Sequence, residues 1–527
     1  MNSKSCRVLA VAAGLLLGAA GCTDITTEPV STVSGGTVFN DPGAYQAFLA
    51  KLYAGLSVTG QQGPDGAGDV AGVDEGFSQY VRQLWQLEEL PTDEAVVGWG
   101  DAGLPELNRQ QWGPANQFTT ALYYRIFFQV ALANEFLREA SDAKLASRNA
   151  SPELRTLVKQ YRAEARFLRA LSYWHGMDLY GPIPLVREDR TGVEPPAQNT
   201  RQEIFDFIVA ELNEIKGDLP TVGEAQYGRA DQGALQMLLA KVYLNAAVYT
   251  GTPRYAEARA AAEAVITSNA YQLDPSYQHL FLADNHTSPE MIFPVPFDGQ
   301  STRTWGGMTF LVHASIGGAM NAADYGVDGG WGGLRARPEL FRLFPGGSGG
   351  PDRRSRVFFT RGQDSMAIAD LSNFTQGPGA PKYRNVTSSG APGASASFPD
   401  TDFPMFRLAD AYLMYAEAVL RGGGGTRGQA LTYVNALRQR AYGSAAGNIA
   451  DAQLTLGFIL DERARELFWE AHRRTDLVRY NQFTENGVWT WKGGTQAGRT
   501  TAAFLNLYPI PSSELLANPL LKQNPGY

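Results

Sequence analysis

Two groups of acidic residues are the first candidates for chemistry, because glycoside hydrolases use a pair of carboxylates that flank the bond they cleave. The first group lies at helical spacing among arginines: Asp461, Glu462, Glu466 and Glu470, with Arg463, Arg465, Arg473 and Arg474. Opposite charges three or four positions apart form ion pairs along a helix. We therefore expect this group to form ion pairs rather than to catalyse a reaction.

The second acidic group, which consists of Glu88, Glu89, Asp93 and Glu94, surrounds Pro91. None of its members has an identifiable partner acid in an environment that would separate a proton donor from a proton acceptor. A hydrolase that uses Glu88 or Glu89 is therefore a minor alternative, and the sequence predicts a protein that is not an enzyme.

The sequence contains no recognisable cofactor or metal motif. Its histidines show no His-x-x-x-His pair and have no cysteine beside them to complete a metal site: His175, His279, His286, His313 and His472. The glycine run at residues 346–350 lacks the Lys-Ser/Thr of a phosphate-binding loop. We expect no cofactor and no nucleotide.

Aromatic residues in glycine-rich and polar stretches are the best candidates for binding. They are Trp99, Trp305, Tyr325 and Trp331, with the polar residues Gln300, Asn321, Asp324, Asp328 and Arg335 along the same stretches. Flat rings on loops can stack on the apolar faces of sugars while nearby polar groups bind the hydroxyls. Among the polar residues, Asn321 and Asp324 are predicted ligand contacts. The alternative is that the rings only attach their loops to the helices.

The N-terminal sequence has the features of a bacterial lipoprotein signal peptide. Lys4 and Arg7 precede an apolar run at residues 8–17 and the small residues 18–21, directly before Cys22. The apolar run is about half the ~20 residues that a membrane-spanning helix needs. We predict that residues 1–21 are removed, that Cys22 is lipidated, and that residues 22–38, rich in Thr, Ser and Gly, form a flexible tether.

The charge balance argues against a nucleic-acid-binding protein, and the cysteine content argues against a disulfide-stabilised one. The chain has 45 Lys and Arg against 53 Asp and Glu, and removal of Lys4 and Arg7 with the signal makes the balance more negative. A negative chain is a poor partner for nucleic acid or an anionic membrane surface. Cys6 and Cys22 are the only cysteines, so the mature protein has no disulfide.

Helical periodicity dominates the remaining chain. Apolar residues from Leu154 to Ser172 follow the 3-4-7 spacing of one long helix, which the sequence Gly-Pro-Ile-Pro at 181–184 terminates. Helix–turn–helix patterns at 233–268 and 409–440, with further helix pairs expected around 118–140 and 456–478, predict four to five tetratricopeptide-like pairs. Residues 297–402 interrupt this pattern with Gly, Ser, Pro, Asp and Asn clusters. A loop-rich segment of this length is usually functional.

Several ordered motifs resemble the SusD/RagB family of outer-membrane nutrient-binding lipoproteins. They lie at 162–170 (RAEARFLRA), 178–186 (DLYGPIPLV), 228–230 (GRA), 406–418 (FRLADAYLMYAEA), 462–467 (ERAREL), 474–479 (RTDLVR), 508–511 (YPIP) and 523–527 (QNPGY). The resemblance spans almost the whole mature chain. It implies a mainly α, SusD-like fold at 39–527, formed by a single domain of tetratricopeptide-like helix pairs with a loop-rich ligand-binding face.

The same resemblance implies a function. Such proteins are not enzymes: they capture oligosaccharides at the cell surface and pass them to a SusC-like TonB-dependent transporter in the outer membrane. The implied location is the outer membrane, with a lipid anchor and a face toward the cell exterior. Residues 92–97 (TDEAVV) resemble a family segment near the binding face, which favours Trp99 as a contact. Some relatives hold a structural calcium, but this sequence identifies no ligands for it.

Two alternatives stay open. One is a relative that binds peptides instead of glycans, and the other is a structural helical-repeat scaffold that binds only another protein. Loops that differ by a few side chains select different ligands on one scaffold, so the sequence does not name the ligand.

Overall fold

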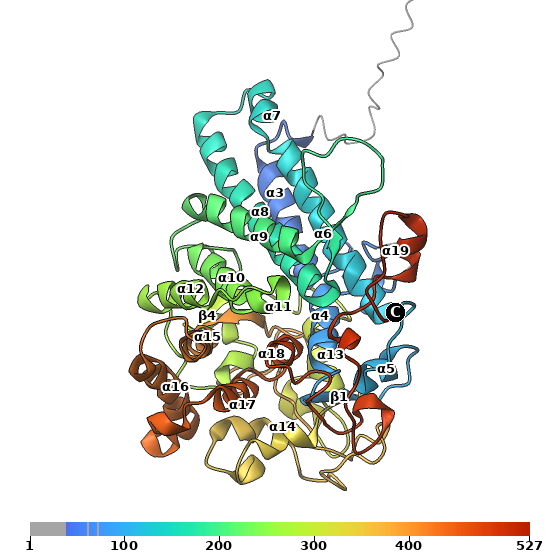
Figure 1. Cartoon of the computed structure of the whole chain (residues 1–527), viewed down its shortest axis with the longest axis vertical. Coiled ribbons are helices and arrows are strands. Elements are labelled where there is room, and N and C mark those ends of the chain that lie inside the picture. The colour runs from blue at the N-terminus through green and yellow to red at the C-terminus, as the bar shows by residue number, and fades with distance from the viewer. Residues whose placement is uncertain (1–37, 61–62, 71–72) are drawn as a thin grey trace, which may run out of the picture. The chain divides into compact units, whose positions relative to one another are not determined.

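Helices make up about half of the chain, and strands are few, which confirms the mainly α prediction (Figure 1). The computed structural model describes residues 38–60, 63–70 and 73–527. Its helices are α3 (Gly43–Ser57), α4 (Tyr80–Glu89), α5 (Leu104–Arg109), α6 (Gln117–Glu139), α7 (Asp142–Ser147), α8 (Pro152–Tyr180), α9 (Arg201–Ile215), α10 (Gln232–Leu244), α11 (Ala246–Thr250), α12 (Tyr255–Thr267), α13 (Gly307–Ala314), α14 (Pro338–Arg342), α15 (Leu408–Leu420), α16 (Arg427–Tyr442), α17 (Leu456–Leu467), α18 (Arg473–Arg479) and α19 (Ser512–Ala517).

Contacts divide the chain into residues 1–44 and 45–527, and the following description concerns the second unit. The predicted signal at 1–21, the lipidated Cys22 and all but the last residue of the tether at 22–38 lie outside the described residues, so these assignments remain predictions. The proposed single domain from residue 39 is likewise a prediction. Among the described residues, no helix is both long and apolar enough to cross a membrane.

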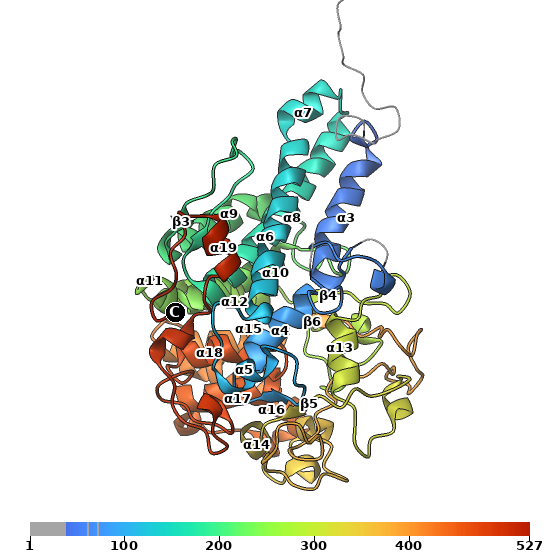
Figure 2. The ribbon, with the colours of Figure 1, turned by 90° about the vertical axis from the view of Figure 1, so that its right-hand side faces the viewer.

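The predicted long helix is α8, and local chemistry explains both of its ends. The side chain of Ser151 accepts a hydrogen bond from the N–H of Leu154, and Pro152 occupies the first turn, where its missing N–H costs nothing. Gly181 ends the helix at a φ of 75°, a backbone conformation that other residues rarely adopt. The α6 helix packs along α8, and α7 connects the two (Figure 2).

The helices of the predicted pairs at 233–268 and 409–440 stack on one another, whereas the pair expected around 118–140 is the single helix α6. The α10 helix packs on α12, α12 packs on α15, and α15 packs on α16, so these helices form one continuous stack. The buried face of α12 carries Ala258, Ala261 and Ala262, whose small side chains let the neighbouring helices approach closely. The predicted break at 422–425 separates α15 from α16, and Gly422, Gly424 and Gly425 adopt positive φ angles there.

The described residues form three two-stranded antiparallel sheets, of which two connect distant parts of the chain. They pair β1 (Ala95–Val97) with β5 (Leu334–Ala336), β2 (Ile183–Pro184) with β3 (Gln198–Asn199), and β4 (Met291–Val295) with β6 (Phe403–Arg407). Because Val295 lies opposite Phe403, the loop-rich segment leaves the helical stack and returns to it at adjacent points. This segment gathers around α13, at the right of Figure 2, and around α14, at the bottom, whereas α11 lies at the left.

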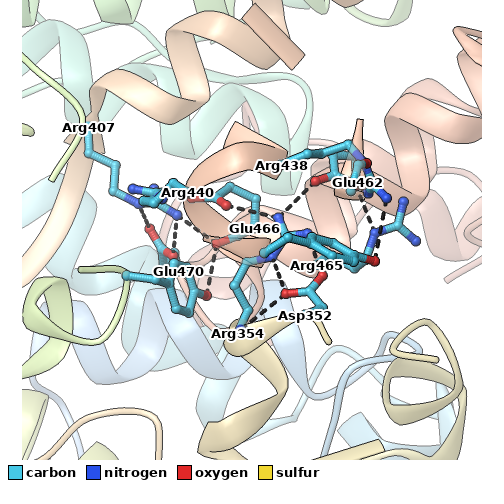
Figure 3. Close-up of polar contacts among 12 residues, drawn as sticks. Asp352, Arg354, Arg407, Arg438, Arg440, Glu462, Arg465, Glu466 and Glu470 are labelled. Carbon is cyan, nitrogen blue, oxygen red and sulfur yellow. Dashed lines mark hydrogen bonds and ion pairs between the residues drawn. The ribbon is translucent and has the colours of Figure 1, made fainter. Parts of the chain in front are cut away.

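The three glutamates of the first acidic group form ion pairs, as expected, but these are buried and most of their partners come from elsewhere in the chain, and no ion pair is seen for Asp461 among the described residues. Figure 3 shows this cluster of ion pairs. The partners of Glu462, Glu466 and Glu470 are Arg354 from the loop-rich segment, Arg407 from β6, and Arg438 and Arg440 from α16. The prediction that Glu470 lies on the same helix as Glu462 and Glu466 is wrong. The α17 helix ends at Leu467, and Trp469 and Ala471 adopt left-handed backbone conformations on either side of Glu470.

Arg407 is the centre of this cluster. Its guanidinium lies 2.8 Å from Glu290, 2.7 Å from Glu466 and 2.7 Å from Glu470. Burial alone would raise the pKa of Glu466, but the surrounding guanidiniums of Arg440, Arg407 and Arg354 lower it to about 2. The carboxylate therefore stays charged inside the protein, where its charge depends on these partners.

The second acidic group is also buried and does not reach the surface as a catalytic pair. Glu88 and Glu89 end α4, and Glu94 precedes β1. The backbone N–H of His472 donates to Glu89, and that of Trp469 donates to Glu94. Burial, together with the charge of Glu94, raises the pKa of Glu89 well above its ordinary value, and burial raises that of Glu94 to about 8. These acids hold the chain that follows α17.

Replacement of Arg407 by Met should lower the free energy of unfolding by about 3–5 kcal/mol, because it leaves Glu466 and Glu470 buried with fewer partners. Urea denaturation measures this loss. The matched control is Arg427→Met, which breaks a 3.1 Å pair with Asp451 that is largely exposed and should stay within about 1 kcal/mol of wild type. Equal losses in the two variants would contradict the central role of Arg407.

Replacement of Glu89 by Gln should flatten the pH dependence of stability. A carboxyl group with a raised folded-state pKa stabilises the fold below its unfolded pKa of about 4.3, and this contribution is lost as pH rises through the folded-state value. Gln mimics the protonated acid and cannot ionise. The variant should match wild type near pH 5 and exceed it by about 1 kcal/mol or more at pH 8, as measured by thermal and urea unfolding.

The control for this experiment is Glu466→Gln, which removes a paired carboxylate and should destabilise the protein at both pH values. If wild type and Glu89→Gln share one pH profile, Glu89 does not carry a proton in the folded protein.

Candidate functional site

Two of the predicted tryptophans meet because of the β1–β5 pairing. Val97 lies opposite Leu334, and the N–H of Gly98 extends the pairing by donating to the carbonyl of Gly333 over 2.9 Å. Trp99 and Trp331 follow and precede these strands, so residues that are 232 positions apart become neighbours. Their ring centroids lie 6.3 Å apart, the ring planes are inclined by 45°, and the indole N–H of Trp99 donates to the carbonyl of Trp331 over 3.3 Å.

Side chains of the α13 helix pack against both tryptophans. His313 stacks on Trp331 with ring centroids 5.0 Å apart and planes 22° apart, and Phe310 packs edge-on against Trp99 at 5.9 Å. We call Trp99, Phe310, His313 and Trp331 the aromatic group. His313 is buried, and its two ring nitrogens face the carbonyl oxygens of Gly329 and Ser397 at 2.7 and 3.1 Å. These contacts attach two loops to α13 and hold Trp331 in place.

Trp305 lies at the other end of α13, two residues before the helix begins. Its ring is 42% exposed and packs on Phe398 with centroids 4.9 Å apart, while its backbone N–H donates to Glu75 over 3.1 Å. Phe398 belongs to the same loop as Ser397, which contacts His313. The α13 helix is roughly 12 Å long, so an extended ligand could contact both ends.

A pocket of about 740 Å³, which we call the Arg82 pocket, is lined by Arg82 on α4, and the same side chain contacts the aromatic group through Phe310. The Arg82 guanidinium lies 4.4 Å from the ring centroid of Phe310 and donates to the carbonyl of Gly76. Burial lowers the pKa of Arg82 to about 10. This value is still well above 7, so the group is charged at neutral pH. Its Nε has no hydrogen-bond partner among the described residues. Asp74 and Asp101 also line this pocket, so it offers both donors and acceptors.

The other predicted contacts lie apart from these rings. Tyr325 is buried, and its ring faces the guanidinium of Arg384 at 5.2 Å, while burial raises its pKa. Asn321 and Asp324 are exposed and hydrogen-bond to each other over 3.0 Å. Arg335 is buried and donates to backbone carbonyls of the 371–376 loop, so it supports that loop. The role of Tyr325, Asn321 and Asp324 in binding stays a prediction.

Sequence reasoning missed Arg82, Phe310, His313 and Phe398. Phe310 and His313 are three positions apart and thus share a helix face, which was a usable signal. Arg82 carries no motif, and only the packing of α4 against α13 brings it to Phe310. No group of three or more His, Cys, Asp or Glu residues in the described part of the chain could hold a metal ion.

Comparison with protein families shows two matches that together cover much of the chain. The model described as "SusD family" matches residues 360–527, and the model described as "Starch-binding associating with outer membrane" matches residues 71–244. The chain is 35% identical to "Starch-binding protein SusD" of Bacteroides thetaiotaomicron over the full length of both proteins. It is 27% identical to "SusD-like protein P2" of Formosa agariphila, which covers 97% of this chain and 98% of that protein.

Solved structures show the same fold. A SusD superfamily protein from Bacteroides thetaiotaomicron aligns with a TM-score of 0.72 at 19% identity, over 92% of this chain and 99% of its own. Surface glycan-binding protein A from the same organism, in complex with laminarihexaose, aligns with a TM-score of 0.67 at 21% identity, over 91% and 98%. The relatives are binding proteins and not enzymes, in agreement with the absence of a catalytic motif in the sequence.

Proposed function

The chain belongs to the SusD family, and we propose that it is a cell-surface glycan-binding lipoprotein that delivers oligosaccharides to a SusC-like TonB-dependent transporter. The observation that carries this proposal is the pair of inclined indoles, Trp99 and Trp331, beside the donors and acceptors of the Arg82 pocket. The starch-binding name of the relative at 35% identity makes an α-glucan the first ligand to test.

The aromatic group has the properties that sugar binding requires. An indole face buries the apolar C–H face of a sugar ring, and the His313 ring stacked beneath Trp331 keeps that indole from rotating. Because the planes of Trp99 and Trp331 differ by 45°, they form a bent platform that suits a curved glycan better than a straight one. Since the tryptophans are held before any ligand arrives, binding costs little ordering entropy.

The Arg82 pocket supplies what the rings lack. The guanidinium of Arg82 and the carboxylates of Asp74 and Asp101 line this pocket and can bind hydroxyl groups as donor and acceptors. A scaffold that bound only another protein would not need a pocket lined by an arginine and two acids near an inclined pair of indoles. A peptide ligand could use the same rings, and the binding experiment therefore includes peptides.

Replacement of Trp331 or Trp99 by Ala should weaken binding of maltooligosaccharides by about tenfold or more, which corresponds to about 1.4 kcal/mol. Trp305→Ala should cause a smaller loss, because Trp305 lies outside the aromatic group. Isothermal titration calorimetry on the mature domain measures each affinity, and thermal unfolding verifies that the fold is intact.

The matched control is Phe504→Ala, which removes a partly exposed ring that packs on Tyr527 near the C-terminus. Its affinity should equal that of wild type. Unchanged affinity in both tryptophan variants would remove the aromatic group from the binding site. Binding of peptides but of no glycan would favour the peptide-binding alternative.

The location and the partner are part of the same proposal. The family model that names association with the outer membrane supports placement there, and the lipid on Cys22 would supply the anchor. A tether between lipid and fold raises the local concentration of the binder beside its transporter without a rigid contact. Because the proposed role is to capture glycans at the cell surface, the proposal also includes a binding domain that faces the cell exterior.

Replacement of Cys22 by Ser should release an intact binder from the membrane and abolish glycan uptake. Cell fractionation measures the release, calorimetry on the released protein should show unchanged affinity, and growth on the glycan measures uptake. Uptake that survives in cells with a fully released protein would exclude the anchored-delivery mechanism. Cys6→Ser is the control, because Cys6 would leave with the signal and should not matter.

A further inference from the structure

A second, smaller cavity lies on another side of Trp99. It measures about 270 Å³ and is enclosed by the end of β1, the α5 helix, the loop at 369–372 and the ring of Trp491. We call it the Trp491 pocket. Ligand pockets for drug-sized molecules usually measure about 300–1,000 Å³, so this one suits a single small ring. Because Trp99 lines the Trp491 pocket and also belongs to the aromatic group, one ligand could contact both.

Trp491 is held in an unusual conformation at this pocket. Its φ of 69° lies in the left-handed region, which side-chain-bearing residues rarely adopt and which often marks a functional position. The indole N–H donates to the carbonyl of Ile368 over 2.9 Å, and the backbone N–H donates to that of Gln496 over 3.2 Å. The ring also packs on the buried Ile368 and Leu371. These contacts fix the indole as part of the pocket wall.

Two polar side chains, Arg109 and Asp370, complete the lining of the pocket. The Arg109 guanidinium lies 5.9 Å from the Trp491 ring centroid, and its buried Nε has no hydrogen-bond partner. No acid pairs with Arg109 in the part of the chain that the structure describes. Asp370 accepts hydrogen bonds from the N–H and the hydroxyl of Ser372 through Oδ1 only. The pocket thus combines an indole, a free donor and a free carboxylate oxygen.

We propose that the Trp491 pocket is a second subsite that binds one neutral hexose unit of the glycan held at the aromatic group. This inference rests on the proposed glycan-binding function. The indole supplies the apolar contact, Arg109 donates to the hydroxyls, and Asp370 accepts from them. The carboxylate of Asp370 repels an acidic sugar, so the unit is neutral. A glycan that is branched, or long enough to extend past the Trp99 ring, occupies both the aromatic group and the Trp491 pocket.

The test compares short and long probes. Calorimetry with maltotriose and maltoheptaose on the mature domain should show about a tenfold loss of maltoheptaose affinity in Trp491→Ala. Affinity for maltotriose should change less than twofold, because the short chain is bound at the aromatic group alone. Arg109→Gln and Asp370→Asn, which leave the Trp491 loop intact, should each weaken maltoheptaose binding about threefold. Arg427→Gln, on the distant α16, is the control and should match wild type.

The outcomes separate the subsite from the function as a whole. If Trp331→Ala weakens both probes while Trp491→Ala, Arg109→Gln and Asp370→Asn change neither, the subsite is excluded and glycan binding stands. If wild type binds neither probe nor the corresponding laminarioligosaccharides, the glycan proposal and the subsite fail together. A crystal structure with maltoheptaose should show a sugar ring against Trp491, and an empty Trp491 pocket beside an occupied aromatic group would overturn the inference.

Discussion

The buried charge cluster around Arg407 is the constraint on which the rest of the structure depends. Arg407 comes from β6 and Glu466 from α17, while Arg354 belongs to the loop-rich segment, so one cluster joins that segment to a strand and to a helix. A buried charge with a missing partner is costly. These elements must therefore assemble together, and the segment that carries the aromatic residues is attached to a rigid support.

This support explains how loops form a preorganised surface. The β4–β6 pairing brings the ends of the loop-rich segment together, and the β1–β5 pairing places Trp99 beside Trp331. The α13 helix fills the space beneath them with Phe310 and His313. A binding surface made of loops usually loses affinity to the ordering of those loops, and here pairing and stacking have already ordered them. The scaffold thus supplies rigidity, and the loops supply chemistry.

The same arrangement bears on selectivity. Trp99 lines the smaller of two cavities, together with Trp491 and Arg109, and packs on Phe310, which contacts Arg82 at the wall of the larger cavity. Each arginine lines its cavity, and the acids Asp74 and Asp101 line the larger cavity together with Arg82. Changes in the loops that carry these residues would alter ligand choice without disturbing the helical stack.

By itself the sequence determined the helices, because apolar spacing, the Ser151 and Pro152 start and the Gly181 end of α8 are local signals that act within one turn. It also singled out Trp99, Trp305 and Trp331, since aromatic residues in polar loops need a reason to be there. Only the tertiary structure decided which of them meet. Strand pairing over 232 positions joins Trp99 to Trp331, and burial turns Tyr325 toward Arg384, while the charges of α17 find partners on β6, α16 and the loop-rich segment. Such contacts depend on packing between distant segments, which no local pattern encodes.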